Sequence, residues 1–277
     1  MKALTHLAVV TLTAALFSGP VVAQVEEDRH PFLDDKFNLG LGIFFPKKNV
    51  SLRVDGNVPE DEIDIDERFD LSNYEATPSL HFRWRFGEKW SFWGQYWSTD
   101  DTGKAVLDED LEWEDVIFKE GTFAKVGIEQ TIARMFFGRT FHTGPRHEFG
   151  AGVGLHWMEI DASVEGEIIL EEGGTGFHTA SVNSDIPLPN IGAWYMYSWS
   201  PKWLFQARLD WLDASIGDYS GSLWNGQVGV HWQTFETLGV GLYLNHFKLD
   251  VDVDKSGWHG KVEDTNIGPF LALTATW

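Results

Sequence analysis

The chain has 277 residues, no Cys and a formal net charge of −21 at pH 7. This acidic balance excludes nucleic-acid binding as a main activity, because such binding needs a basic surface. It also argues against docking on an anionic membrane face. The lack of Cys means that an exported form must be held together by something other than disulfides.

The N-terminus has the layout of a targeting segment. Lys2 lies in a short polar start, an apolar run follows over residues 7–17, and Ala23 supplies a small residue at a cleavage position. We therefore predict that residues 1–23 are a signal peptide, since the apolar run is too short to span a membrane as a helix. Residues 24–35 are predicted to be a flexible polar lead-in.

From residue 36 onward, apolar residues recur with the period of two that is typical of β-strands. The parity is ambiguous around residues 132–137, where a bulge is one explanation. We predict ten strands, centred on residues 37–45, 77–86, 90–98, 125–138, 148–158, 191–199, 203–212, 223–232, 238–246 and 267–277.

The connections between these strands alternate in length. Short turns at 87–89, 142–147, 200–202 and 234–237 alternate with longer stretches at 47–76, 99–124, 159–189, 213–222 and 247–266. This alternation is typical of outer-membrane barrels, and termini that both lie on the short-turn side require an even strand number. We predict an all-β, up-and-down antiparallel transmembrane barrel of about ten strands over residues 36–277, with strand extensions above the membrane.

Aromatic residues gather at the strand ends. A girdle at one membrane interface is predicted for Phe86, Trp90, Trp199, Trp203, Trp232 and Trp277, and a second set lies at Tyr96, Trp157, Trp211 and Trp224. The apolar strand faces would then meet lipid, and the polar faces would line the lumen. The alternative is a soluble periplasmic barrel in which these aromatics form a dry core.

The last strand alternates from Ile267 and ends in an aromatic residue, Trp277. It resembles the C-terminal strand of bacterial outer-membrane β-barrel proteins, which usually end in Phe, and the pattern of the whole chain is similar in style to the small barrels around OmpA and OmpW. The resemblance implies an outer-membrane location after export, contact with outer-membrane lipid and lipopolysaccharide, and recognition of the last strand by the β-barrel assembly machinery. It names no substrate.

The polar strand faces give a candidate lumen lining. Its members are His81, Arg83, Arg85, Gln95, Arg208, Asp210, Gln227 and His231. A barrel of about ten strands has a narrow interior, so charged side chains there can pair across the lumen and plug it. A narrow pore lining and a catalytic role remain alternatives.

Carboxylates gather on the long-loop side, over residues 60–70 and 108–115 and at Asp250, Asp252 and Asp254. The last three share one strand face and are weak candidates for Ca²⁺ or Mg²⁺ ligands or for cation-bridged contact with lipopolysaccharide phosphates. A solvated acidic rim is the alternative, because no stretch has the spacing of a dedicated calcium loop. We expect no cofactor.

The leading hypothesis is a non-enzymatic outer-membrane barrel, structural or a narrow porin-like conduit, with acidic extracellular loops. The alternative is a hydrolase with a site at the rim. Omptin proteases resemble this chain in strand number, and their catalytic acidic and His residues lie above the membrane. His246, Asp250 and His259 lie in a comparable zone here. No omptin motif is present. Lipid A deacylases use Ser and His near the rim, for which His178 and Ser181 are an analogue.

Overall fold

The computed structural model describes residues 29–55, 63–64, 76–107, 111–113, 116–169, 175–216, 219–255 and 258–277. The expected signal peptide, residues 1–23, lies outside the described residues, as do most of the two acidic stretches at 60–70 and 108–115. Within the described ranges, no helix is long and apolar enough to cross a membrane.

One short helix precedes a series of strands. The elements are α1 (Pro31–Asp34), β1 (Phe37–Phe44), β2 (Lys47–Asp55), β3 (Ile63–Asp64), β4 (Thr77–Phe86), β5 (Trp90–Val106), β6 (Leu111–Trp113), β7 (Val116–Phe118), β8 (Phe123–Thr143), β9 (His147–Ile169), β10 (Thr175–Ser200), β11 (Trp203–Ile216), β12 (Tyr219–Gln233), β13 (Leu238–Lys255) and β14 (Trp258–Thr276). All ten predicted strands are present, several of them longer than expected.

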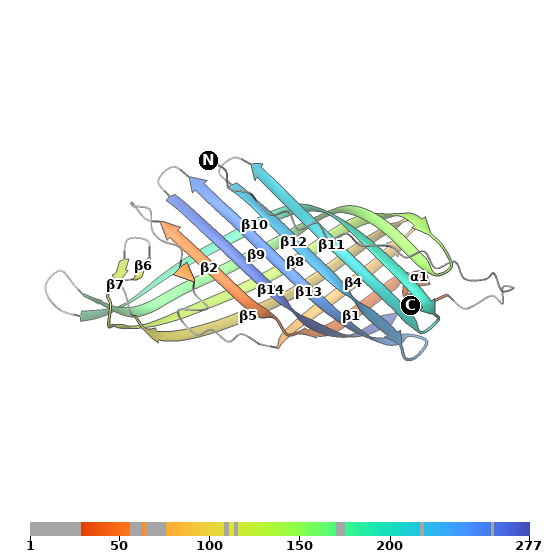
Figure 1. Ribbon diagram of the computed structural model, residues 1–277, viewed down its shortest axis with the longest axis horizontal. Helices are drawn as coiled ribbons and strands as arrows, with labels where there is room; N and C mark the ends of the chain where they lie inside the picture. The colour runs from red at the N-terminus through yellow and green to blue at the C-terminus, as the bar shows by residue number, and fades with distance from the viewer. Residues whose placement is uncertain are drawn as a thin grey trace, which may run out of the picture.

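Sequential antiparallel pairing closes these strands into a barrel. The first and last strands meet, with Asn38 of β1 paired with Thr276 of β14. β2 continues β1 against β14 in the same register, so the two act as one strand, interrupted near Pro46, which has no backbone N–H to donate. In the described part of the chain the barrel therefore has ten strands and α1 at the end where the chain terminates, with β6 and β7 at the opposite end (Figure 1).

Next to the short turns, the outer face of the barrel is apolar. On β13, for example, Leu242 and Leu244 are exposed while Tyr243 and Asn245 are buried inside. This part of the barrel is called here the transmembrane half. On the outer face it extends from the short turns up to Ile43, Leu80, Tyr96, Ala133, Trp157, Ile191, Trp211, Trp224, His246 and Ile267. An apolar exterior around a polar interior is the arrangement that lipid requires.

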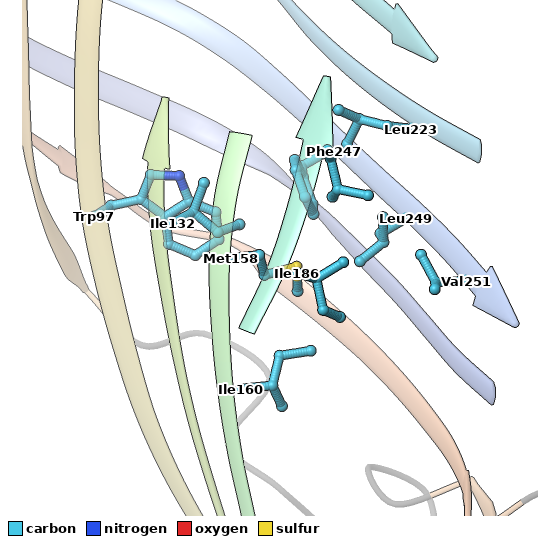
Figure 2. Close-up of a cluster of buried hydrophobic side chains, with 10 residues drawn as sticks. Trp97, Ile132, Met158, Ile160, Ile186, Leu223, Phe247, Leu249 and Val251 are labelled. Atoms are coloured by element: carbon cyan, nitrogen blue, oxygen red, sulfur yellow. The ribbon is translucent and has the colours of Figure 1, made fainter. Parts of the chain in front are cut away.

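Beyond these residues the two faces exchange character. On β13, Lys248 points outward, whereas Leu249 and Val251 are buried inside. Figure 2 shows ten inward side chains from β5, β8, β9, β10, β12 and β13 packed into one cluster in this part of the barrel. We call it the long-loop half, and its apolar interior with a polar exterior is that of a protein surrounded by water.

A second apolar cluster extends this interior further from the membrane. It includes Phe118, Val126 and Val164, each of which is buried. The predicted strand extensions are therefore a packed β-structure, and the stretch expected as a long connection at 159–189 forms most of the β9–β10 hairpin.

Candidate functional site

The interior of the transmembrane half is crossed by a buried ion pair. Arg134 of β8 donates from Nε to Asp210 Oδ2 of β11 at 2.5 Å and from Nη2 to Oδ1 at 2.8 Å. The two side chains are 2% and 0% exposed, and their strands are separated by β9 and β10, so the bond reaches across the lumen. A bidentate pair of this kind fixes both side chains and fills part of the lumen between their strands.

A histidine beside this pair is fully satisfied by neutral partners. His156 Nδ1 lies 3.0 Å from Asn190 Oδ1, and Asn225 Nδ2 lies 2.8 Å from His156 Nε2. When Asn225 donates to Nε2, the proton of His156 must sit on Nδ1, which donates to Asn190. Although Asp210 is 3.8 Å away, this burial and bonding favour a structural histidine over a catalytic base.

A second ion pair lies closer to the short turns. Arg85 Nη2 is 2.7 Å from Glu148 Oε2, and Trp194 Nε1 donates to Glu148 Oε1 at 2.9 Å. The Trp194 ring fills lumen space next to Gly150, where an added Cβ would lie 2.2 Å from the ring. Glycine at this position therefore makes room for a large side chain inside the barrel.

The N-terminal segment closes the barrel at the short-turn end. Residues 29–35 depart from the flexible polar lead-in expected from the sequence, because Phe32 and Leu33 of α1 are buried and contribute to an apolar cluster with lumen residues. The Phe32 carbonyl accepts hydrogen bonds from Arg83 and Arg85, and the Leu33 carbonyl accepts one from Arg85. The arginines thus hold the helix in the mouth as a plug.

Between the plug and the Arg134–Asp210 pair lies a small cavity of about 40 Å³. Its lining includes Phe32, Arg83, Arg134 and Arg208. On the other side of the ion pair, Ile132 and the rest of the apolar cluster in Figure 2 fill the interior. The lumen is thus filled in succession by the plug, the polar network and an apolar core.

The residues predicted to line the lumen all belong to the inner strand faces. Buried side chains are Arg83, Gln95, Arg208, Asp210, Gln227 and His231, while His81 and Arg85 are half-buried. Arg208 Nη2 donates to Gln95 Oε1 at 3.1 Å, and Gln227 Nε2 donates to Asn245 Oδ1 at 2.9 Å. The His231 ring lies 4.9 Å from that of Phe32, against the plug.

Three central members of the network were missed from the sequence: Arg134, Glu148 and His156. Arg134 lies in the stretch of ambiguous parity, where Phe136 faces inward and Phe137 outward, so that both faces read as apolar. Glu148 and His156 share the inner face of β9 with Gly150, Gly152 and Gly154. That alternation was visible in the sequence and could have identified both.

The predicted girdle residues lie around the short-turn end. Trp90, Trp199, Trp203, Trp232 and Trp277 are exposed, and Phe86 is half-buried. The Trp203 ring stacks between Trp199 and Trp232, at 6.0 Å from each. Two further aromatics, which were not predicted from the sequence, stack on other girdle residues. The Phe137 ring lies 5.0 Å from that of Trp90, and the Phe37 ring lies 5.6 Å from that of Trp277.

Asp250 and Asp252 of β13 face outward from the long-loop half. Partial burial and the nearby Glu263 raise the pKa of Asp250, and Asp252 lies two residues away on the same face. The side chain of Asp254 lies outside the described residues. Within the described ranges, no group of three or more His, Cys, Asp or Glu residues is placed to hold a metal ion.

The candidate rim residues do not form a catalytic pair in the described structure. His178 and Ser181 belong to opposite faces of β10, since they lie three positions apart along the strand. His246 and Asp250 share the outer face of β13 but lie four residues apart along the strand. The side chain of His259 lies outside the described residues.

No known protein-family profile matches the chain, and no curated protein matches it in sequence. Among solved structures, the outer membrane protease OmpT from Escherichia coli superposes with a TM-score of 0.58 at 11% identity, over 88% of this chain and 97% of that one. The chain has the fold of an outer-membrane β-barrel. This confirms the predicted class, an all-β antiparallel transmembrane barrel of ten strands.

Other similar structures are more distant. The toluene transporter TbuX from Ralstonia pickettii gives a TM-score of 0.37 at 10% identity, over 91% of this chain and 92% of that one. The attachment invasion locus protein Ail of Yersinia pestis gives 0.30 at 8% identity, over 85% and 99%. At these identities the likeness concerns the fold alone.

Proposed function

We propose that this outer-membrane barrel is a closed, non-conducting anchor that carries a rigid β-structure outside the cell. The filling of the lumen is the observation that supports this proposal. Phe32 plugs the mouth, the Arg134–Asp210 pair crosses the middle, and the Ile132 cluster fills the interior beyond it. A hydrated conduit would need a continuous space, whereas the cavity in this region measures about 40 Å³.

Export and assembly follow the usual route for this fold. Residues 1–23 would act as a signal peptide and leave the mature chain near Gln24. The outer face of β14 carries Ile267, Leu271 and Leu273, and the exposed Trp277 follows its last residue. We propose that the β-barrel assembly machinery recognises this strand. With both ends of the barrel sheet on the periplasmic side, the long-loop half stands outside the cell.

The outer face of the long-loop half is the surface that would meet the polar part of the lipopolysaccharide layer. On β9 this face carries Glu159, Asp161 and Glu165, and Lys125 of the neighbouring β8 lies opposite Glu165. Carboxylates can share divalent cations with the phosphates of lipopolysaccharide. We propose this contact as the role of the acidic surface.

Conductance tests the proposal directly. The mature protein would be purified, shown to be folded by its heat-dependent shift on a denaturing gel, and reconstituted in a planar bilayer, with an open porin as the positive control. We expect no current steps above the bare-bilayer baseline. Reproducible current steps from the folded protein would contradict the closed anchor and show that the barrel is a conduit.

The lack of Cys allows a clean test of orientation, because a single introduced Cys is the only thiol. Asn183→Cys lies on the exposed outer face of β10 in the long-loop half, and Glu236→Cys lies in a short turn. A membrane-impermeant maleimide added to intact cells should label the first variant and not the second. Labelling of Glu236→Cys alone would show that the short turns, and not the long-loop half, face the outside of the cell.

A further inference from the structure

The interior of the transmembrane half carries more positive than negative charge. Its described, inward-facing strand residues include four arginines and two carboxylates: Arg83, Arg85, Arg134, Arg208, Glu148 and Asp210. Asp210 is paired with Arg134, and Glu148 is paired with Arg85. Two guanidinium groups, those of Arg83 and Arg208, are left with no carboxylate in direct contact among the described side chains.

These two arginines have only neutral partners at hydrogen-bond distance. Arg83 donates to the Phe32 carbonyl, and its Nη1 lies 3.7 Å from the sulfur of Met196. Arg208 donates to Gln95. Glu148 and the half-buried Asp35 act on Arg83 through electrostatic attraction, and Asp210 acts on Arg208 in the same way. Buried charges need a counter-charge, because desolvation costs several kcal/mol per ion when none is present.

The unused donors of these residues belong to one cavity. Arg83 Nε, Arg134 Nη1, Arg208 Nε and Asn38 Nδ2 are buried without a hydrogen-bond partner, and all four residues line the cavity of about 40 Å³ behind the plug. The exposed fractions of these four side chains are below a tenth. Of the lining side chains, Gln206 contributes the one unpartnered acceptor, Oε1, in the described structure. Unpartnered donors on residues that line one cavity, together with excess positive charge, fit an anion and disfavour a cation.

We propose that this cavity binds a small inorganic anion of the size of chloride, held by Arg83, Arg134 and Arg208. The volume of about 40 Å³ is on the scale of a few water molecules, which limits the occupant to a small ion. Water would satisfy the donors but would add no negative charge to balance the excess of arginines. Because α1 lies on one side of the cavity and the apolar cluster on the other, refolding in the presence of the anion gives it access.

Anomalous diffraction identifies the ion directly. The mature protein would be refolded in sodium bromide, crystallised, and measured at the bromine absorption edge. We expect one anomalous peak inside the barrel, within hydrogen-bond distance of the three arginines. Density in the cavity without an anomalous signal would assign the cavity to water and overturn the proposal.

A stability measurement gives an independent test. The midpoint of the heat-dependent gel shift would be compared for protein refolded in chloride and in gluconate at equal ionic strength. An ion that binds only the folded barrel raises the midpoint, by about 4 °C or more at saturating chloride. Arg208→Gln should abolish this difference.

The matched control is Arg139→Gln. Arg139 is exposed on the outer face of β8, where its guanidinium lies over the rings of Trp90 and Phe141. This variant should keep the full chloride effect. Equal midpoints in the two salts for the wild type, or an unchanged chloride effect in Arg208→Gln, would overturn the proposal. If Arg208→Gln does not fold, the bromide peak in the wild type decides the question.

Discussion

The transmembrane half and the long-loop half are built from the same strands, yet opposite faces are apolar in the two. On β13, Leu242 and Leu244 face outward around the buried Asn245, and three residues further on Lys248 faces outward while Leu249 is buried. Successive side chains of the strand keep alternating between the outer and the inner face. The surroundings of the outer face change from lipid to water. Which face is apolar therefore reports the solvent of each segment, and the point of exchange marks the edge of the membrane.

The two interiors are also stabilised in different ways. The transmembrane half depends on cross-lumen bonds such as Arg134–Asp210, in which each partner satisfies a buried charge. The long-loop half depends on packed apolar side chains such as Met158 and Leu249. Loss of a buried charged partner should therefore cost the most stability in the transmembrane half. In the long-loop half, loss of a buried apolar side chain should cost the most.

The largest effect is expected for Asp210→Ala. It leaves Arg134 buried without its partner, which costs about 3–5 kcal/mol for a broken buried pair. The free energy of unfolding would be measured by urea titration in lipid vesicles. Asp213→Ala, an exposed position on the same strand, is the control and should stay within about 0.5 kcal/mol of the wild type. Equal effects of the two variants would show that the ion pair does not support the lumen.

Neighbouring residues of β13 test the apolar core. Leu249→Ala removes a side chain that is 0% exposed in the cluster of Figure 2. We expect a loss of about 2–5 kcal/mol, because a cavity is left behind. Lys248→Ala, one residue away on the exposed face, should change stability by less than about 0.5 kcal/mol. A greater loss from Lys248→Ala would mean that the faces are assigned the wrong way round.

An arginine introduced on the outer face of β14 should destabilise the barrel in the transmembrane half and not in the long-loop half. Leu271 of β14 is 48% exposed to lipid, and Leu271→Arg should cost about 2–4 kcal/mol near the centre of the membrane. Thr265→Arg lies on the same face in the long-loop half and should be close to neutral. The urea titration used for Asp210→Ala measures both. A similar loss at Thr265 would move the membrane edge beyond this residue.

A smaller effect depends on pH. Asp264 is buried in the long-loop half, where it accepts from Gln130 at 2.5 Å and from Asn266 at 2.7 Å, and burial raises its pKa from 3.8 to about 7. The folded protein then binds this proton more tightly than the unfolded chain does. Stability should therefore fall as pH rises from about 4 to about 7 and then level off, because both states are ionised above the folded pKa.

Asp264→Asn keeps a polar side chain of similar shape and removes the titration. The free energy of unfolding of this variant should lose the decline between about pH 4 and pH 7 that the wild type shows. The comparison of slopes across this range is the measurement. A decline of the same size in the variant would assign the pH dependence to another group.

The ten strands were accessible from the sequence because alternation and turn residues are local signals. The partners inside the lumen were less accessible. Arg134 and Asp210 are separated by 76 positions, and their meeting depends on which strands face each other once the barrel has closed. The plug was missed because two apolar residues, Phe32 and Leu33, in a helix of four residues give no periodic signal. The glycines opposite Trp194 become meaningful only when the inner face is known.

Accessibility along β13 tests the central claim, a filled barrel whose faces exchange character, most directly. Single Cys residues at positions 242 to 252 would each carry a spin label in the reconstituted protein, since the chain has no other thiol. We expect lipid-phase collisions at 242 and 244, water-phase collisions at 248, 250 and 252, and protection from both at 247, 249 and 251. Water-phase collisions at 247, 249 and 251 would contradict the claim, because they would require a hydrated lumen in place of the apolar core.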